Sequence, residues 1–303
     1  MINGFVIIDK PAGITSHDVV SRVRRILGTR KVGHTGTLDP FATGVLPVAV
    51  NDGTKVIPFL DEGSKTYEAL LRLGVTTDTL DMTGTLLSES HNYNFTKEQF
   101  LSTLFHFTGA ISQIPPMYSA IKQNGQPLYK LARQGVEVER KSRDVEIYSI
   151  DLLSFDPPNV SIRVVCSRGT YIRTLADDIG RILGCGAALQ ELRRTASGPF
   201  LIENSVTLSE LESAVGEGRG ESFNLKPMKV LEHLPEIPLS PAGLDGLHFG
   251  RSPSWASTNL KAPLFCSTET AVCLTSAGNL VALATLLPNN GADARILLKR
   301  VLV

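Results

Sequence analysis

The sequence predicts an α+β protein with a mixed, largely antiparallel sheet, followed by a small β-rich domain. Strand and helix patterns are interspersed without regular strand–helix–strand alternation, which disfavours a doubly wound parallel sheet. Short apolar runs separated by turn residues recur, as is typical of hairpins. The 303 residues, 42% hydrophobic and 20% charged, have a globular composition and suit one large domain plus a small one.

The first predicted elements surround a glycine-rich loop. A strand over residues 4–10 ends at Pro11, and a helix follows with Thr15 or Ser16 as its cap. That helix has an apolar stripe and a basic face. Glycines then flank Asp39 and a proline in a long irregular loop that precedes a strand over 45–50.

The middle of the chain alternates strands and helices. We expect strands over residues 67–73 and 160–166. A helix over 96–107 opens with a capping Thr96, and a second helix begins at 172 and stops at Gly184.

Composition changes towards the C-terminus. Residues 216–222 predict a flexible surface loop, and the prolines of 235–241 predict a stiff linker. Three short apolar runs follow, at 271–274, 280–284 and 294–298. They predict a small β-rich domain over 240–303, after a main domain over 1–235.

Several common chemistries lack their motifs. The chain contains no GxxxxGK[ST], no GxGxxG after a strand, no HExxH and no GxSxG. The six histidines lack metal-ligand spacing, so we expect no metal and no cofactor. No apolar run is long enough to span a membrane, and the start does not resemble a secretory signal, so we expect a cytoplasmic protein. The cysteines (Cys166, Cys185, Cys266, Cys273) are interpreted as buried thiols.

Charge is balanced overall but not locally. Thirty basic and thirty acidic residues give a net charge of zero. Residues 22–31 and 122–143 are nevertheless rich in lysine and arginine. Such stretches form either a phosphate-binding surface or a merely solvated charged face.

Five positions are candidates for a reactive site. Asp39 is presented from a shaped loop, either as a functional carboxylate or as an ordinary turn residue. Tyr67 begins a strand, where its ring is either a core residue or a stacking platform for a base. Tyr171 and Arg173 lie at a strand-to-helix junction, where the arginine is able to pair with a buried carboxylate and hold it ionised. Leu192 adds an apolar residue beside two cations.

Five blocks of sequence together resemble the TruB-type tRNA pseudouridine synthases. Their order and spacing fit that family across roughly the first 200 residues. The blocks are VIIDKPAGITS (6–16), GHTGTLDPFATGVL (33–46), KTY (65–67), IPPMYSAIK (114–122) and CSRGTYIR (166–173).

The resemblance implies that the protein isomerises uridine 55 in the T-loop of tRNA to pseudouridine, without a cofactor. It assigns the essential carboxylate to Asp39 and the role of keeping it ionised to Arg173. Attack at the base, attack at the sugar and removal of a sugar proton all stay open for Asp39. Tyr67 is expected to stack on the target base and is a candidate for removing its C5 proton. Tyr171 is expected to line the pocket, and Leu192 to form its apolar wall.

The resemblance also implies how RNA is held. A base inside a folded loop has to be extruded before it can react, and His34 is expected to fill the space that the base leaves. Lys122 and Lys130 belong to an RNA-binding insertion over about 122–146, with Gly125 and Gly135 as hinges. Lys10 and Pro11 are expected to pack and position.

The last 60 residues fit a PUA-like RNA-binding domain loosely, and this domain is expected to contact the acceptor end of tRNA. We expect a monomer without an obligate protein partner. Two other hypotheses stay open. One is an RNA-guided synthase subunit, and the other is a non-catalytic protein that helps tRNA to fold.

Overall fold

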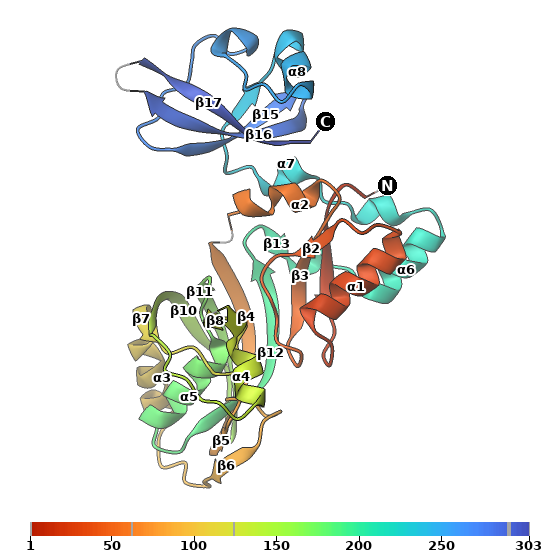
Figure 1. Ribbon diagram of the computed structural model, residues 1–303. Helices are drawn as coiled ribbons and strands as arrows, with labels where there is room; N and C mark the ends of the chain where they lie inside the picture. The colour runs from red at the N-terminus through yellow and green to blue at the C-terminus, as the bar shows by residue number, and fades with distance from the viewer. Residues whose placement is uncertain (1, 62, 124, 290–291, 303) are drawn as a thin grey trace.

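The computed structural model describes residues 2–61, 63–123, 125–289 and 292–302. Within them a nine-stranded sheet runs through the main domain, and a four-stranded sheet forms the C-terminal domain (Figure 1). The order of the large sheet is β1-β3-β12-β4-β11-β10-β7, with β2 beside β3 and β13 beside β12. The described ladders of this sheet are antiparallel except β3–β12, which confirms a mixed, largely antiparallel α+β fold.

The strands of the large sheet are β1 (Gly4–Lys10), β2 (Val32–His34), β3 (Thr43–Val50), β4 (Ser64–Leu73), β7 (Gly109–Gln113), β10 (Arg143–Asp156), β11 (Asn159–Ser167), β12 (Ala187–Ser197) and β13 (Phe200–Leu201). Two small ladders pair β5 (Val75–Thr77) with β6 (Leu86–Glu89) and β8 (Lys122–Gln123) with β9 (Gln126–Pro127). The C-terminal sheet contains β14 (Glu236–Pro238), β15 (Thr270–Ser276), β16 (Asn279–Asn289) and β17 (Ala292–Val301).

The helices are α1 (Ser16–Leu27), α2 (Gly53–Val56), α3 (Lys97–His106), α4 (Leu128–Arg133), α5 (Ile172–Ile182), α6 (Leu208–Gly216), α7 (Pro227–Val230) and α8 (Pro241–His248). Short 3-10 turns cover Ile57–Phe59, Ile202–Asn204, Gly220–Phe223 and Trp255–Ser257.

Helix starts follow the predicted capping chemistry. Of the two candidate caps of α1, Thr15 is the one used, because its hydroxyl accepts the Asp18 backbone N–H at 3.0 Å. Thr96 caps α3 in the same way.

The two halves of the large sheet have separate cores. Helices α1 and α6 pack on β1 and β3, whereas α3 and α5 pack on β4, β10, β11 and β12 (Figure 1). The strand pairing β3–β12 joins these halves, so the residues near that junction are brought together from distant parts of the sequence.

Two predictions near the C-terminus differ from the structure. Residues 217–219 are an exposed connection, but the predicted loop over 216–222 is too long, because α6 extends to Gly216 and a 3-10 turn begins at Gly220. The predicted linker contains β14, which pairs parallel to β15 as an edge strand of the second sheet. The fully buried side chain of Ile237 holds β14 in this position. Pro238 is tolerated in β14 because an edge strand needs backbone donors on one side only.

The three later strands confirm the β-rich C-terminal domain, consistent with a PUA-like module. All four cysteines are buried free thiols, as predicted. In the described part of the chain, the helices are too short or too polar to cross a membrane.

Candidate functional site

Five segments meet around a pocket of about 270 Å³ in the main domain. They are the loop between β2 and β3, the strands β4 and β12, the connection between β7 and β8, and the turn from β11 into α5. The volume is near the lower end of small-molecule sites, about 300–1,000 Å³, and suits a single flat ring. The lining residues are Gly36, Thr37, Leu38, Asp39, Lys65, Tyr67, Ser119, Ala120, Arg168, Gly169, Thr170, Tyr171, Ile172, Arg173, Leu192 and Arg194.

Asp39 lies in the loop between β2 and β3. Lys10 of β1 binds the backbone of this loop. The Lys10 side chain is fully buried, and its Nζ donates to the carbonyls of Pro11 at 2.9 Å, Pro40 at 3.1 Å and Ala42 at 2.7 Å. Burial lowers the pKa of Lys10 to about 8. The predicted packing role of Lys10 therefore takes the form of fixing the loop that presents the carboxylate.

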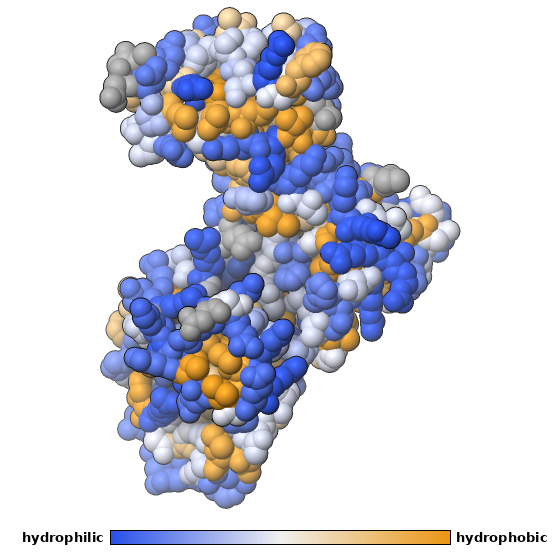
Figure 2. All heavy atoms as spheres, in the orientation of Figure 1, coloured by the Kyte–Doolittle hydropathy of each residue, from blue (hydrophilic) through white to orange (hydrophobic). Residues whose placement is uncertain are grey.

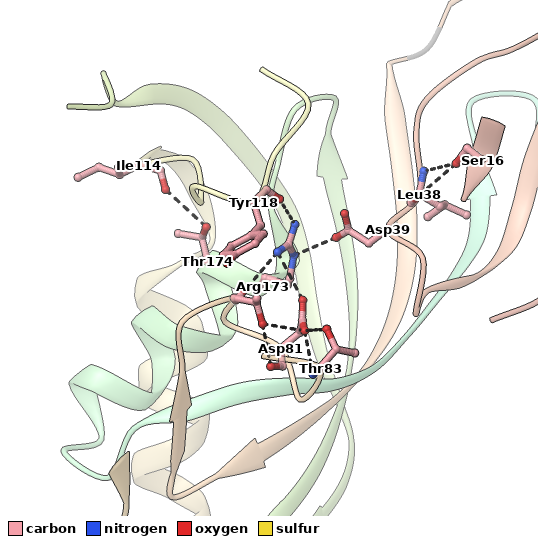
Figure 3. Close-up of polar contacts among 10 residues, drawn as sticks. Ser16, Leu38, Asp39, Asp81, Thr83, Ile114, Tyr118, Arg173 and Thr174 are labelled. Atoms are coloured by element: carbon pink, nitrogen blue, oxygen red, sulfur yellow. Dashed lines mark hydrogen bonds and ion pairs between the residues drawn. The ribbon is translucent and has the colours of Figure 1, made fainter. Parts of the chain in front are cut away.

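Ser16, at the start of α1, ties down the same loop. Its hydroxyl accepts the Leu38 backbone N–H at 2.9 Å and donates to the Leu38 carbonyl at 3.1 Å (Figure 3). These bonds satisfy the backbone N–H and the carbonyl of Leu38, the residue before Asp39. They therefore hold the backbone from which the Asp39 side chain extends. It points across the pocket to Arg173 (Figure 3).

Arg173, at the start of α5, lies between two carboxylates. Its Nε is 2.9 Å from Asp39 Oδ2, and its Nη1 is 3.4 Å from Asp81 Oδ2 (Figure 3). Nη1 also donates to the Thr79 carbonyl at 2.9 Å, and Nη2 to the Tyr118 carbonyl at 2.8 Å. Only 3% of the arginine side chain is exposed. The structure therefore shows the pairing that the sequence suggested, with Asp81 as an unforeseen third member.

The electrostatic balance at Asp39 differs from a simple ion pair. Burial raises the pKa of this carboxyl, the Arg173 charge opposes the rise, and the Asp81 charge adds to it. The net direction is upward, because burial outweighs the Arg173 charge and the Asp81 charge adds to the rise. Since 34% of the Asp39 side chain is exposed, the carboxylate still opens into the pocket.

The two tyrosines of the pocket are held in their neutral form. Burial raises the pKa of Tyr67, against the opposing charge of Arg194. Burial also raises the pKa of Tyr171, whereas the Ser119 side chain and the charge of Arg143 act to lower it. A neutral phenol suits stacking and hydrogen-bond donation better than proton removal.

Arg194 and Lys65 are pocket residues that the sequence did not single out as site residues. Arg194 is buried, and it donates from Nε to the Val45 carbonyl at 2.8 Å and from Nη2 to the Gly36 carbonyl at 2.9 Å. Lys65 Nζ donates to Ser197 Oγ at 2.8 Å. The side-chain alternation of β12 could have revealed Arg194, because it places the neighbouring Arg193 and Arg194 on opposite faces of the sheet.

Asp81 gave no such signal, because an aspartate between threonines is common in turns. Its Oδ1 accepts from the Thr83 backbone N–H at 3.0 Å and from the Thr79 hydroxyl at 2.9 Å. These bonds fix the carboxylate that faces Arg173.

Five predicted site residues come together in the pocket, namely Asp39, Tyr67, Tyr171, Arg173 and Leu192. Three others lie outside its lining. His34 ends β2 and pairs with Val48 of β3. Lys122 lies in β8 and Lys130 in α4, and both are exposed. The roles given to all eight residues stay predictions.

Comparison with known proteins identifies relatives along most of the chain. Residues 24–172 match the model of the TruB family pseudouridylate synthase N-terminal domain, and residues 173–232 match the tRNA pseudouridylate synthase B C-terminal domain. The tRNA pseudouridine synthase B of Geotalea uraniireducens is 49% identical over 283 residues, 93% of this chain and 91% of that protein. The protein of the same name from Geobacter sulfurreducens is 50% identical over 252 residues, 83% of each chain.

A solved structure shares the fold. The chain of a Cbf5-Nop10-Gar1 complex superposes with a TM-score of 0.72 at 29% identity, over 98% of this chain and 83% of that chain.

Proposed function

Because the chain belongs to the TruB family of tRNA pseudouridine synthases, we propose that it isomerises uridine 55 in the T-loop of tRNA to pseudouridine. The observation that carries the proposal is the Asp39 carboxylate, which opens into a base-sized pocket and is paired with a buried arginine.

The reaction needs no external energy source, because it is a net isomerisation in which substrate and product have the same composition. The bond from C1′ to N1 breaks, the uracil reorients, and C5 bonds to C1′ while the C5 proton is lost and N1 gains one. Asp39 acts by attack at the base, by attack at the sugar or by removing a sugar proton. Each route starts from the ionised carboxylate, and the Arg173 charge favours that form.

The target base has to leave the folded RNA loop before it fits this pocket, at a cost of a few kcal/mol in lost stacking. Tyr67 stacks on the extruded base, Leu192 forms the apolar wall, and Tyr171 lines the opposite side near Asp39. His34 fills the space that the base leaves. The exposed Lys122 and Lys130 bind the RNA from the insertion, which closes at Gly125 and Gly135.

The wider assignments follow from the same proposal. The enzyme acts as a monomer in the cytoplasm, and its C-terminal domain contacts the acceptor end of tRNA. Four buried free thiols support a reducing compartment. Gel filtration with light scattering tests the oligomeric state, and loss of affinity for a tRNA that lacks its acceptor end tests the contact.

A subunit of a larger complex is the second candidate, since a chain of the Cbf5-Nop10-Gar1 complex shares the fold. The relatives named tRNA pseudouridine synthase B are more similar in sequence, at 49–50% identity. They favour an enzyme that acts on tRNA by itself.

The test is tritium release from a tRNA transcript labelled at uridine C5, with purified protein and no added metal or nucleotide. We expect wild-type release at one site per tRNA, position 55, and none from Asp39→Ala, which still binds the RNA. Asp156→Ala removes an exposed carboxylate outside the pocket lining and keeps full activity. Binding without release by the wild type would contradict the proposal and favour the tRNA-folding or complex-subunit hypothesis.

A further inference from the structure

Two arginines without an assigned role lie near the pocket that Tyr171 lines. Arg168 lies in the turn between β11 and α5 and lines the pocket. Arg143 begins β10 and lies close enough to the Tyr171 phenol for its charge to oppose the rise in pKa of that group. Both side chains are exposed, and neither guanidinium has an acidic or hydrogen-bonding partner within the described part of the chain.

Arg168 differs from the other cations that line the pocket. Arg173 and Arg194 are buried and bonded to protein groups, and Lys65 is buried against Ser197. Arg168 is therefore the lining cation with a guanidinium exposed to solvent. The turn that carries it is closed by the Thr170 hydroxyl, which donates to the Ser167 carbonyl at 2.9 Å, and Gly169 supplies the φ of +85° within this turn.

The register of the sheet directs Arg143 to the same side as Tyr171. Arg143 pairs with Gln113 of β7, so the two side chains share a face of the sheet. Gln113 binds the Tyr171 backbone, since its Oε1 accepts the N–H at 3.0 Å and its Nε2 donates to the carbonyl at 3.3 Å. The nearby acids Asp144 and Glu146 alternate with Arg143 along β10 and lie on the opposite face.

We propose that Arg143 and Arg168 form a two-arginine clamp at the mouth of the pocket, which binds a phosphodiester next to the target nucleotide. A nucleotide whose base enters the pocket leaves its backbone at the mouth, where two unpaired guanidiniums present forked donors that match phosphate oxygens. The clamp fixes the entry of the nucleotide, and no part of the base is recognised by it. The inference rests on the proposed function for the identity of the RNA.

The clamp is tested by the salt dependence of RNA binding. For each of Arg143→Ala and Arg168→Ala we expect roughly 5–20-fold weaker binding of a T-loop stem-loop near 0.1 M salt. The slope of log K against log salt should fall by about 0.7–1 per lost contact. Arg163→Ala is the matched control, because it removes an exposed arginine of β11 that pairs with Glu68 at 2.9 Å. It should leave the slope unchanged.

Chemical neutralisation of the phosphate gives an independent readout. A methylphosphonate on the 5′ or on the 3′ side of the target uridine should weaken wild-type binding on one of these sides. The same methylphosphonate should weaken RNA binding by the Arg143→Ala and Arg168→Ala proteins only slightly, because these variants have already lost the interaction with that phosphate. Arg168→Lys keeps the charge and should keep the salt slope while losing part of the affinity.

Unchanged slopes in both alanine variants, or equal methylphosphonate effects in wild type and variants, would overturn the clamp. These are binding measurements, so they stand apart from catalysis. A wild type that binds but releases no tritium refutes the proposed function, whereas an active wild type with unaltered variants refutes the clamp alone.

Discussion

At the scale of single residues, the candidate site combines a carboxylate with an environment that disfavours its charge. Asp39 is partly buried, and Arg173, its compensating cation, also faces Asp81. A fully paired Asp39 would be a stable but weak base, because a strong ion pair lowers its pKa. Burial keeps the Asp39 pKa raised despite Arg173, the Asp81 charge adds to the rise, and the carboxylate is left more basic.

This balance predicts the pH dependence of the reaction. Arg173→Met removes the charge that opposes the raised pKa of Asp39, so that pKa rises further. The acidic limb of single-turnover rate against pH, measured at saturating RNA, should therefore move to higher pH, with a lower plateau. Arg163→Met is the control and should leave the limb in place. An unmoved limb in Arg173→Met would show that the limb does not report Asp39.

Asp39 is also predicted to lower the stability of the folded protein at neutral and alkaline pH. Its folded pKa lies above the unfolded value, so its contribution to stability is present below the unfolded pKa and is lost as pH rises through the folded pKa. Asp39→Asn should melt at a higher temperature than the wild type near pH 8, because Arg173 keeps Asp81 as its partner. The difference should fade towards pH 4, and a variant that melts lower at pH 8 would contradict it.

At the scale of elements, the loop between β2 and β3 is rigid although it has no regular structure. Lys10 from β1, Ser16 from α1 and Arg194 from β12 bind its backbone carbonyls. A loop fixed from three elements loses little further freedom when a substrate binds. It therefore presents Asp39 as firmly as a strand would.

The close contact of β3 with β12 gives a prediction for Gly44. A Cβ at this position would lie 2.2 Å from the Arg194 carbonyl oxygen, and the glycine has a φ of +98°. Gly44→Ala should lower the free energy of unfolding by about 3 kcal/mol or more, since overpacking and backbone strain add. Gly28→Ala has a positive φ without a clash and should cost only about 1–2 kcal/mol. Urea denaturation followed by circular dichroism measures both, and equal costs would contradict the close contact.

At the scale of the whole molecule, the two sheets share one apolar cluster. Cys273 and Leu283 from the C-terminal sheet pack with Phe5, Val45 and other buried residues of the main domain. Lys55 Nζ also donates to the Val301 carbonyl at 2.8 Å. In Figure 1 this contact lies where α2 and α7 meet the C-terminal domain, and Figure 2 shows exposed apolar side chains on that domain as well.

The shared cluster predicts that the two domains unfold together. Trp255, the single tryptophan, lies in the C-terminal domain, so its fluorescence reports that domain while circular dichroism reports the whole chain. Both should give one coincident urea transition in the wild type. Leu283→Ala should destabilise the protein by about 2–4 kcal/mol, whereas Leu87→Ala, which is exposed, should not. Separate wild-type transitions would show independent domains.

The local pattern of the sequence determined most elements of the fold. Thr15 and Thr96 as caps, the strand periodicity near Tyr67 and the glycine stop of α5 depend on neighbouring residues only. The segment 235–241 was misassigned because a buried partner, Ile237 against Leu274, overrode the turn signals of its prolines. The candidate residues Asp39, Tyr67, Tyr171 and Arg173 were also accessible from sequence, because their motifs form ordered blocks, and Leu192 was accessible as an apolar residue beside two cations.

Only the tertiary structure decided the partners of those residues. That Arg173 is shared with Asp81, that Arg194 is buried while Arg193 reaches Asp9, and that Arg143 pairs with the Gln113 that binds the Tyr171 backbone all depend on strand register and helix packing. Sequence spacing carries no information on such contacts between distant segments. Their effect on charge is largest where burial removes water, and burial is a property of the assembled fold.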